Sequence, residues 1–331
     1  MTNVKVGFIG VGGIASVHLK NISNIEHATI AAVCDISAER VKQVGEQYKA
    51  NGYTDIDEML ENESLDALFV CVPPFAHGDI EEKAAALGIH MMVEKPLGLN
   101  LENVTAKAKI IEKSGVICAT GYCLRYLDTV SKAKEYLQGK DIAMVRGHYI
   151  TSFVQTPWYR SMAKSGGQLV EQSTHTLDLI RYLAGDVNTV YANMALRLMG
   201  DIPDIDIPDV TSVSITLESG AIGHLTSSFT QADHYTGIEL LGRNFRVMLD
   251  NTTLHIIEKD KTISYKSNLD FYAAQDRAFI DAVRLNDKEL VLAPYGEALK
   301  TLAVTLAANA SNKTGEAIHL SEFMSALPCV N

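Results

Sequence analysis

Three ionisable residues stand at helical spacing after a pair of glycines. Glu171, His175 and Asp178 lie in a segment that begins with Gly166-Gly167 and continues as an apolar helix over residues 170–184. At 100° per residue, the three side chains would project within a sector of about 60°. A histidine with carboxylates beside it can act as a general acid and base, because its ordinary pKa lies near neutral pH. The spacing therefore predicts a proton-transfer site on this helix.

Two other interpretations fit the same residues. Glu171 and His175 could be a solvated i,i+4 pair on a polar helix face. Glu171, His175 and Asp178 could also offer one nitrogen and two oxygens to a metal ion. No second histidine or cysteine has ligand spacing nearby. We therefore predict no metal site.

Lys95 is the second candidate for chemistry. It stands between Glu94 and Pro96, directly after an apolar run at residues 90–93 that predicts a buried strand. Such a lysine is either a solvated surface charge or a partly buried group whose pKa falls into the range useful for proton transfer. The residues alone leave both possibilities open.

A strand, a glycine turn and a helix open the chain. Residues 4–9 are apolar, and the pattern G-x-G-x-x-A follows them. In such a turn the first glycine permits the bend, the second lets the backbone approach a pyrophosphate, and the small third residue lets the helix pack on the strand. The amides at the start of the helix then bind phosphate. The residues predicted to bind a cofactor here are Gly10, Gly12, Gly13, Ile14 and Ala15.

An acidic residue lies where a dinucleotide site needs one. Asp35 ends the apolar run at residues 29–34, about twenty positions beyond the glycines. Its carboxylate would accept a hydrogen bond from a ribose hydroxyl and repel a 2′-phosphate, so NAD is predicted over NADP. Ile36 beside it joins the predicted cofactor-binding residues. Asp35 could also be the N-cap of the helix that opens at residues 37–40, and both roles can hold.

Strands and helices alternate through residues 4–120, which predicts right-handed βαβ units and a parallel sheet with helices on both faces. Ligands of such sheets bind beyond the carboxyl ends of the strands. Five short segments lie at those ends: Gly10, Asp35, Pro73-Pro74, Glu94-Lys95 and Gly121-Tyr122. We therefore expect one cofactor cleft there.

From about residue 124 the pattern changes to two-residue alternation. Strand-like runs are joined by hairpin-turn sequences at residues 218–220 and 242–244. The fold class is thus an α/β Rossmann domain, residues 1–123, followed by an α+β domain, residues 124–331, with a large, mostly antiparallel open sheet. A helix at about residues 295–310 is expected to pack back on the first domain. Nothing in the sequence covers the outer sheet face, so we expect a homodimer or homotetramer.

Composition narrows the class of protein. The 331 residues are 47% hydrophobic with a net charge of −11, which argues against a nucleic-acid partner. No apolar run of 18 residues and no signal-peptide pattern occur, so we expect no membrane partner and a cytoplasmic location. The cysteines are expected to be reduced core thiols: Cys34, Cys71, Cys118, Cys123 and Cys329.

Taken together, these motifs resemble the Gfo/Idh/MocA dehydrogenases, relatives of glucose–fructose oxidoreductase and inositol dehydrogenase. The resemblance spans essentially the whole chain. It rests on the glycine turn at residues 10–15, Pro73-Pro74-Phe75-Ala76-His77, Glu94-Lys95-Pro96, and the Gly166-Gly167 helix with His175. It implies NAD(P)-dependent oxidation of a sugar, a polyol or a similar carbinol, and oligomerisation through the open sheet.

The resemblance also assigns roles to single residues. Lys95 matches the lysine that touches the nicotinamide ribose and the substrate hydroxyl, and His175 the histidine that exchanges the hydroxyl proton. Glu171 stands where inositol dehydrogenases usually have aspartate, so it either contacts substrate or orients His175. Pro73 and His77 match positions that line the dinucleotide, and Glu94 joins them as a predicted cofactor-binding residue.

The substrate pocket is less specified. Tyr122 and Arg125 are expected to face the site because their segment resembles the family's entry into the second domain. Trp158 is either a substrate wall or an anchored loop aromatic. Asp178 completes the predicted substrate-binding residues.

The predicted reaction is reversible hydride transfer between a small carbohydrate-like substrate and NAD. Two alternatives remain open at this point. One is an NAD-dependent glycosidase that works by transient oxidation, and the other is a non-catalytic dinucleotide-binding regulator.

Overall fold

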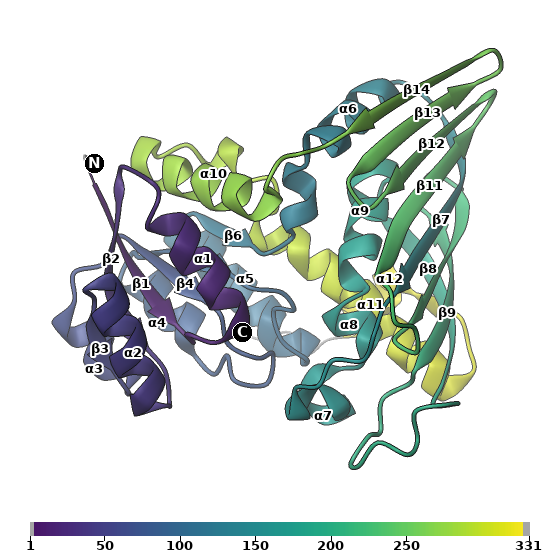
Figure 1. The fold of residues 1–331 in the computed structure, drawn as a ribbon. Coiled ribbons are helices and arrows are strands. Elements are labelled where there is room, and N and C mark those ends of the chain that lie inside the picture. The colour runs from purple at the N-terminus through teal and green to yellow at the C-terminus, as the bar shows by residue number, and fades with distance from the viewer. Residues whose placement is uncertain (1–2, 327–331) are drawn as a thin grey trace. The chain divides into compact units, whose positions relative to one another are not determined.

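The computed structural model describes residues 3–326, and the chain divides into two compact units (Figure 1). The first contains the residues up to Gly98, Asn103–Tyr126 and Asp270–Ala298. The second contains Leu99–Glu102, Leu127–Leu269 and the residues from Leu299 onward. The domain boundary after residue 123 stays a prediction, and the compact units add that Asp270–Ala298 packs with the first of them.

The first unit holds a parallel sheet whose strands, among the described residues, run in the order β3-β2-β1-β4-β5-β6. This is the order of the Rossmann fold, in which ligands bind where the strand order reverses. The predicted parallel sheet is therefore confirmed. Its strands are β1 (Val4–Ile9), β2 (Ala28–Cys34), β3 (Asn51–Tyr53), β4 (Ala67–Val70), β5 (His90–Val93) and β6 (Cys118–Thr120).

Helices of the first unit pack on this sheet through apolar stripes. In α1 (Gly13–Ile22) the buried residues Ala15, His18, Leu19 and Ile22 recur at helical spacing. This helix lies beside α10 (Phe271–Leu285). The remaining elements that lie wholly in this unit are α2 (Ala38–Tyr48), α3 (Ile56–Asn62), α4 (Ile80–Ala86), η1 (Cys123–Tyr126) and η3 (Lys288–Leu290).

An aromatic stack ties the sheet to α10. The Phe69 ring of β4 lies 4.8 Å from the Phe8 ring of β1 and 5.5 Å from the Phe279 ring of α10. Ring pairs at these separations add to the gain from apolar burial. A segment more than 200 residues further along the chain therefore completes the core of the first unit.

The second unit holds a large sheet in the order β14-β13-β12-β11-β7-β10-β9-β8-β15. Its pairs are antiparallel except for β7 with β10, so the predicted mostly antiparallel sheet is confirmed. The strands are β7 (Ile142–Ile150), β8 (Val187–Ala195), β9 (Val210–Leu217), β10 (Ile222–Ser228), β11 (Tyr235–Gly242), β12 (Phe245–Asp250), β13 (Thr253–Glu258), β14 (Lys261–Lys266) and β15 (Ile318–His319).

Helices cover one face of this sheet. The covering helix α9 (Thr174–Ala184) lies on β7 and β11, and α6 (Asp128–Leu137) lies on β12 and β13. Gly147 of β7 permits the close approach of α9, since a Cβ there would lie 2.9 Å from Thr176 and 3.1 Å from Ile180. Successive side chains of each strand point to opposite faces, and the face opposite the helices exposes Tyr191, Ser212, Ser214, Ile222 and His224.

The continuous helix predicted over residues 170–184 is wrong, because the chain forms α8 (Gln168–Glu171) and then α9. The amides of Gln172 and Ser173 both donate to the Gln168 carbonyl, and the next turn tightens as His175 donates to the Gln172 carbonyl. Serine and threonine favour helix ends over helix interiors, which explains a break at Ser173, the N-cap of α9. The common 60° sector for Glu171, His175 and Asp178 assumed that single helix and no longer follows from it.

The described chain is completed by η2 (Pro157–Arg160), α5 (Leu101–Ser114), α7 (Met162–Ser165), α11 (Tyr295–Thr314) and α12 (Leu320–Ser325). Cys34, Cys71, Cys118 and Cys123 are buried free thiols, whereas Cys329 lies outside the described residues. Within residues 3–326, no helix has the length and apolar character needed to cross a membrane.

Candidate active site

The glycine turn between β1 and α1 has the geometry of a phosphate-binding loop. Gly10 has φ +80°, and a Cβ there would lie 2.6 Å from the Cys71 carbonyl oxygen. Gly12 is the N-cap of α1 and offers no side chain, while a Cβ on Gly13 would meet open space. The first amides of α1 have no carbonyl of their own helix to bind. The turn can therefore receive an anionic group at the positive end of a helix.

Asp35 holds the end of β2 against this turn. Its Oδ2 accepts from the Val11 amide at 3.0 Å, and its Oδ1 accepts from the Ser37 amide at 2.9 Å. The N-cap of α2 is Ser37, not Asp35. The Arg40 guanidinium lies 3.4 Å from Oδ2, and the Ile36 side chain beside it is 95% exposed. A carboxylate oxygen has two lone pairs, so Oδ1 can accept one further hydrogen bond.

The loop after β4 carries a buried histidine held by a carboxylate. His77 Nδ1 lies 2.5 Å from Glu81 Oε1, and Lys107 Nζ lies 2.6 Å from Glu81 Oε2. Burial by itself raises the pKa of Glu81, but the hydrogen bonds and charges of His77 and Lys107 lower it below its ordinary value. An ionised Glu81 only accepts hydrogen bonds, so Nδ1 carries the proton between the two side chains. Within the described residues, Nε2 is buried and has no hydrogen-bond partner.

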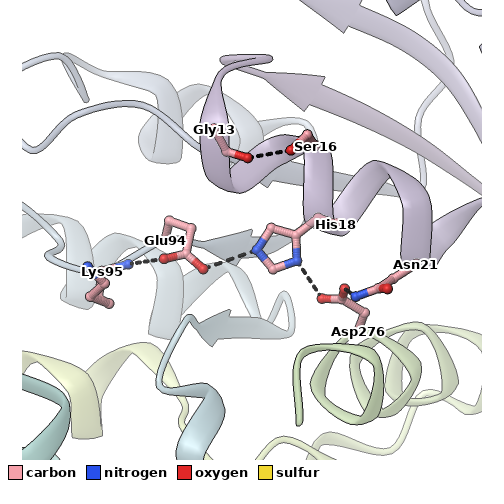
Figure 2. A network of polar contacts seen from close by, with 7 residues as sticks. All are labelled: Gly13, Ser16, His18, Asn21, Glu94, Lys95 and Asp276. Atoms are coloured by element: carbon pink, nitrogen blue, oxygen red, sulfur yellow. Dashed lines mark hydrogen bonds and ion pairs between the residues drawn. The ribbon is translucent and has the colours of Figure 1, made fainter. Parts of the chain in front are cut away.

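Lys95 is half-buried at the carboxyl end of β5. Its amide donates to Glu94 Oε2 at 3.1 Å (Figure 2). Gly121, at the end of β6, leaves room for the Glu94 carboxylate, since a Cβ there would lie 2.4 Å from Glu94 Oε1. Glu94 and Lys95 therefore lie at the same edge of the sheet as the glycine turn and Asp35, because all four follow the carboxyl ends of parallel strands.

Behind Lys95, Glu94 binds a buried histidine. His18 Nε2 lies 3.1 Å from Glu94 Oε1, and His18 Nδ1 lies 2.7 Å from Asp276 Oδ1. Ionised carboxylates only accept hydrogen bonds, so both ring nitrogens must carry protons. Burial by itself lowers the pKa of His18, but the hydrogen bonds and charges of Asp276 and Glu94 raise it from 6.5 to about 10. His18 is thus an imidazolium at neutral pH.

This shift makes the stability of the protein depend on pH. The folded-state pKa of His18 lies above the unfolded value, so the ring stabilises the fold fully below pH 6.5, and that contribution is lost as the pH rises through about 10. His18→Gln is expected to lower the free energy of unfolding by about 3–5 kcal/mol at neutral pH, because it leaves buried carboxylates unpaired. Urea denaturation across this range should show the deficit of His18→Gln shrinking as the pH rises.

The matched control for this experiment is Asn21→Ala. Asn21 donates to Asp276 Oδ2 at 2.8 Å, so its loss removes a hydrogen bond from the same network without removing a charge. The Asn21→Ala variant should keep the wild-type dependence of stability on pH. A deficit of His18→Gln that stays constant to alkaline pH would contradict the assignment of an imidazolium.

Tyr122 and Arg125, predicted to bind substrate, are 2% and 4% exposed. Arg125 Nη1 donates to the Leu292 carbonyl at 2.7 Å, and the Leu292 amide donates to the Tyr126 hydroxyl at 2.9 Å. These bonds fix η1 to the segment after η3. Arg125 therefore has a structural task in the first unit, and the substrate contact of both residues stays a prediction.

In the second unit, Glu171 ends α8 and His175 lies in the first turn of α9, and both are half-buried. Asp178, one turn further on, is 1% exposed, and its Oδ1 accepts from the Thr301 hydroxyl at 3.0 Å. Asp178 is thus bound to α11. Its predicted substrate contact and the predicted roles of Glu171 and His175 remain predictions.

An aromatic cluster lies next to the break between α8 and α9. Tyr159 is fully buried, and its hydroxyl donates to Gln172 Oε1 at 2.7 Å. Trp158 packs against this cluster, which also contains Ile207 and Phe229. The anchored-aromatic interpretation of Trp158 therefore has a structural basis, and its role as a substrate wall stays a prediction. In the part of the chain that the structure describes, no three histidine, cysteine or acidic side chains are grouped to hold a metal ion.

Sequence reasoning missed the partners that hold the predicted residues in place. His18 carried a usable signal, because it stands among the apolar residues on the buried stripe of α1. A histidine there needs polar partners. Asp276 gave no such signal in the sequence, since it lies 258 residues from His18. Glu81 and Lys107, which hold His77, had the appearance of ordinary helix-surface charges.

Comparison with known proteins fits this arrangement. Residues 4–122 match the family described as "Oxidoreductase family, NAD-binding Rossmann fold", and residues 132–255 match the "GFO/IDH/MocA C-terminal domain". The chain belongs to the Gfo/Idh/MocA family. The resemblance seen in its motifs is thus confirmed, and so is the fold class of a Rossmann domain followed by a large open sheet.

Curated relatives of this Gfo/Idh/MocA protein include oxidoreductases of modest identity. An uncharacterised oxidoreductase of Bacillus subtilis is 27% identical, over 86% of this chain and 88% of the relative. Myo-inositol 2-dehydrogenase of Thermotoga maritima is 29% identical, over 75% of each chain.

A solved structure shares the whole fold. It is an oxidoreductase from Agrobacterium radiobacter in complex with NAD+, L-tartaric acid and magnesium. It superposes with a TM-score of 0.86 over 97% of this chain and 99% of that one, at 20% identity.

Proposed function

We propose that this protein is an NAD-dependent oxidoreductase that transfers a hydride between a CH–OH carbon of a sugar or polyol and the nicotinamide. One observation carries the proposal. Lys95 follows a parallel strand at the sheet edge that also carries the glycine turn and Asp35. In a member of an oxidoreductase family, a lysine at the same sheet edge as a dinucleotide turn is expected to take part in the chemistry. A solvated surface lysine would have no such role. The inositol dehydrogenase among the relatives supports a polyol as substrate.

The residues present fit a dinucleotide. The open space at Gly13 and the first amides of α1 would take the pyrophosphate. The Asp35 carboxylate would accept from the ribose hydroxyls, which favours NAD. The exposed Ile36 side chain would lie against the adenine, and the buried Nε2 of His77 offers a polar atom without a hydrogen-bond partner within the described residues. When bound, the nicotinamide supplies the hydride acceptor.

The chain's own side chains would handle the hydroxyl. His175 would take the hydroxyl proton, and Lys95 would hold and polarise the oxygen as it becomes a carbonyl. Glu171 would orient His175 or contact the substrate. For proton transfer, the hydroxyl must come within about 2.6–3.2 Å of the accepting group.

The direct test is a spectrophotometric screen for NADH with named compounds. Purified protein would be incubated with NAD and, in turn, myo-inositol, scyllo-inositol, D-glucose and levoglucosan. Stoichiometric NADH with at least one compound is expected. Release of an aglycone from aryl glycosides without net NADH would instead indicate the glycosidase reaction. NAD binding without either product would contradict catalysis and favour a regulator.

We also propose that the outer face of the large sheet forms a homo-oligomer contact. This face exposes Tyr191 and Ile222 among serine and histidine side chains. Ile222 is 52% exposed on that face, at the start of β10. An apolar centre with a polar rim is the usual composition of a protein interface.

The expected result is a dimer or tetramer in analytical ultracentrifugation that Ile222→Asp weakens by about tenfold or more in dissociation constant. A charge buried without a partner at an interface costs at least the free energy that corresponds to a tenfold change in dissociation constant. Leu285→Asp, which also replaces an exposed apolar residue but on α10, is the matched control and should assemble normally. A wild-type monomer would contradict the proposal.

A further inference from the structure

A buried charge network joins three segments of the first unit. His18 comes from α1, Glu94 from the end of β5 and Asp276 from α10. Figure 2 shows the imidazole between the two carboxylates and the Glu94 carboxylate reaching the backbone of Lys95. The helix that carries His18 also begins at the glycine turn. One helix thus connects the proposed phosphate-binding turn to the proposed catalytic lysine.

The network is costly if its purpose is only to hold α1 and α10 together. The side chains of His18 and Asp276 are fully buried, and that of Glu94 is 6% exposed. Removing such ions from water offsets most of what their attraction gains, so well-packed apolar side chains often stabilise as much. Phe69 and Phe279 already pack these elements apolarly. The charges therefore need another explanation.

Their position suggests one. Glu94 uses one oxygen for His18 and the other for the Lys95 amide, so a rotation of the carboxylate would break both hydrogen bonds. The imidazolium also balances one of the two carboxylates, which leaves one net negative charge next to the lysine. The same three residues thus control both the backbone and the electrostatic surroundings of Lys95.

We propose that His18 and Asp276 are positioning residues for Lys95: they fix the Glu94 carboxylate against the lysine backbone and set the charge that the lysine amine experiences. The inference rests on the proposed function, in which Lys95 polarises the substrate oxygen. To polarise that oxygen, the Lys95 amine must point in a defined direction and hold a defined charge.

Other titratable groups near the network leave its charge unchanged. Burial first, and then the charge of Glu94, raise the pKa of the Cys71 and Cys123 thiols well above their ordinary value, so both stay neutral. Tyr272 of α10 presents its ring at 83° to His18, with 6.1 Å between the ring centroids. Cys71 and Cys123 therefore add no charge to that of Glu94, His18 and Asp276.

The test is competitive acetylation of the full-length protein by acetic anhydride, without cofactor or substrate. Mass spectrometry would follow the modification of Lys95 against pH, with the exposed Lys42 of α2 as the internal reference. His18→Gln removes a positive charge and should move the Lys95 labelling curve to higher pH. Asp276→Asn removes a negative charge and should move it to lower pH. Each shift is expected to be on the order of one pH unit, or about tenfold in labelling at a fixed pH.

Asn21→Ala is the control that alters the hydrogen bonds of the network and none of its charges, and it should leave the curve in place. Shifts of the same sign in His18→Gln and Asp276→Asn, or no shift in either, would overturn the proposal. If His18→Gln does not fold, Asp276→Asn carries the test, because asparagine keeps the size of the side chain and an oxygen acceptor for Nδ1. An unmoved curve in that variant would overturn the proposal as well.

A second measurement separates this inference from the proposed function. Turnover of the four screening compounds would be compared in wild type, His18→Gln, Lys95→Ala and the double variant. If His18 acts through Lys95, His18→Gln lowers kcat about tenfold in the wild-type background and not at all after Lys95→Ala. Equal losses in both backgrounds would overturn the positioning role. Wild-type turnover by Lys95→Ala would overturn the proposed function, whereas the labelling shifts would still report the charge around the lysine.

Discussion

Replacing Lys95 by alanine is expected to lower kcat by about 10²-fold or more, the usual scale for a lost acid–base or polarising group. The affinity for NAD should change little, because the glycine turn and Asp35 lie on other strands and keep their contacts. Steady-state kinetics with the compound that gives NADH, together with calorimetric titration of NAD, would measure the two quantities separately. A loss confined to kcat would mean that Lys95 acts on the reacting atoms.

Two further variants sharpen this result. Lys95→Arg keeps the positive charge but cannot give up a proton in the working range. Partial recovery with arginine would indicate that the lysine polarises the oxygen, and no recovery would indicate that it transfers a proton. Lys42→Ala, an exposed lysine of α2, is the matched control and should behave as wild type.

His175→Ala should show a loss of similar size with a different signature. A general base contributes in its neutral form, so wild-type kcat is expected to fall on the acid side as His175 gains a proton. The alanine variant should lose that limb of the pH–rate profile. Near-wild-type turnover in both Lys95→Ala and His175→Ala would contradict the proposed mechanism.

The first unit could be predicted from the sequence because its signals are local. Apolar runs at β1, β2 and β5 end in residues that cannot continue a buried strand, and the glycine spacing gives the turn directly. The position of the cofactor site then follows, because ligands of parallel sheets bind beyond the carboxyl ends of the strands. What the local pattern could not supply is α10, whose Asp276 and Phe279 reach this unit from far along the chain.

The second unit shows where a local rule fails. A single helix through Glu171 and His175 follows from periodicity, yet the chain breaks at Ser173, where two amides compete for one carbonyl. The hairpins around β10 and β12 were predictable from their turns and alternation. By contrast, neither β13 nor β14 was predicted. The side chains of β14 are almost all exposed and give no alternation to detect.

Replacing Asp35 by serine is expected to shift coenzyme preference from NAD towards NADP by about two orders of magnitude in the ratio of kcat/KM values, roughly tenfold from each coenzyme. Serine removes the carboxylate that would accept from the ribose and repel a 2′-phosphate. It also releases Arg40, whose guanidinium lies 3.4 Å from Asp35 Oδ2 and could then bind that phosphate. Initial rates with each coenzyme would give the ratio.

Asp35 also accepts hydrogen bonds from the Val11 and Ser37 amides, so a serine could simply loosen the glycine turn. Two variants separate these effects. Asp35→Asn keeps an oxygen acceptor for one amide while removing the charge, and it should shift the preference in the same direction by less. Adding Arg40→Ala to Asp35→Ser should cancel the gain with NADP. If instead all three variants lose NAD and NADP activity equally, Asp35 holds the turn and does not select the coenzyme, and NAD preference would need another source.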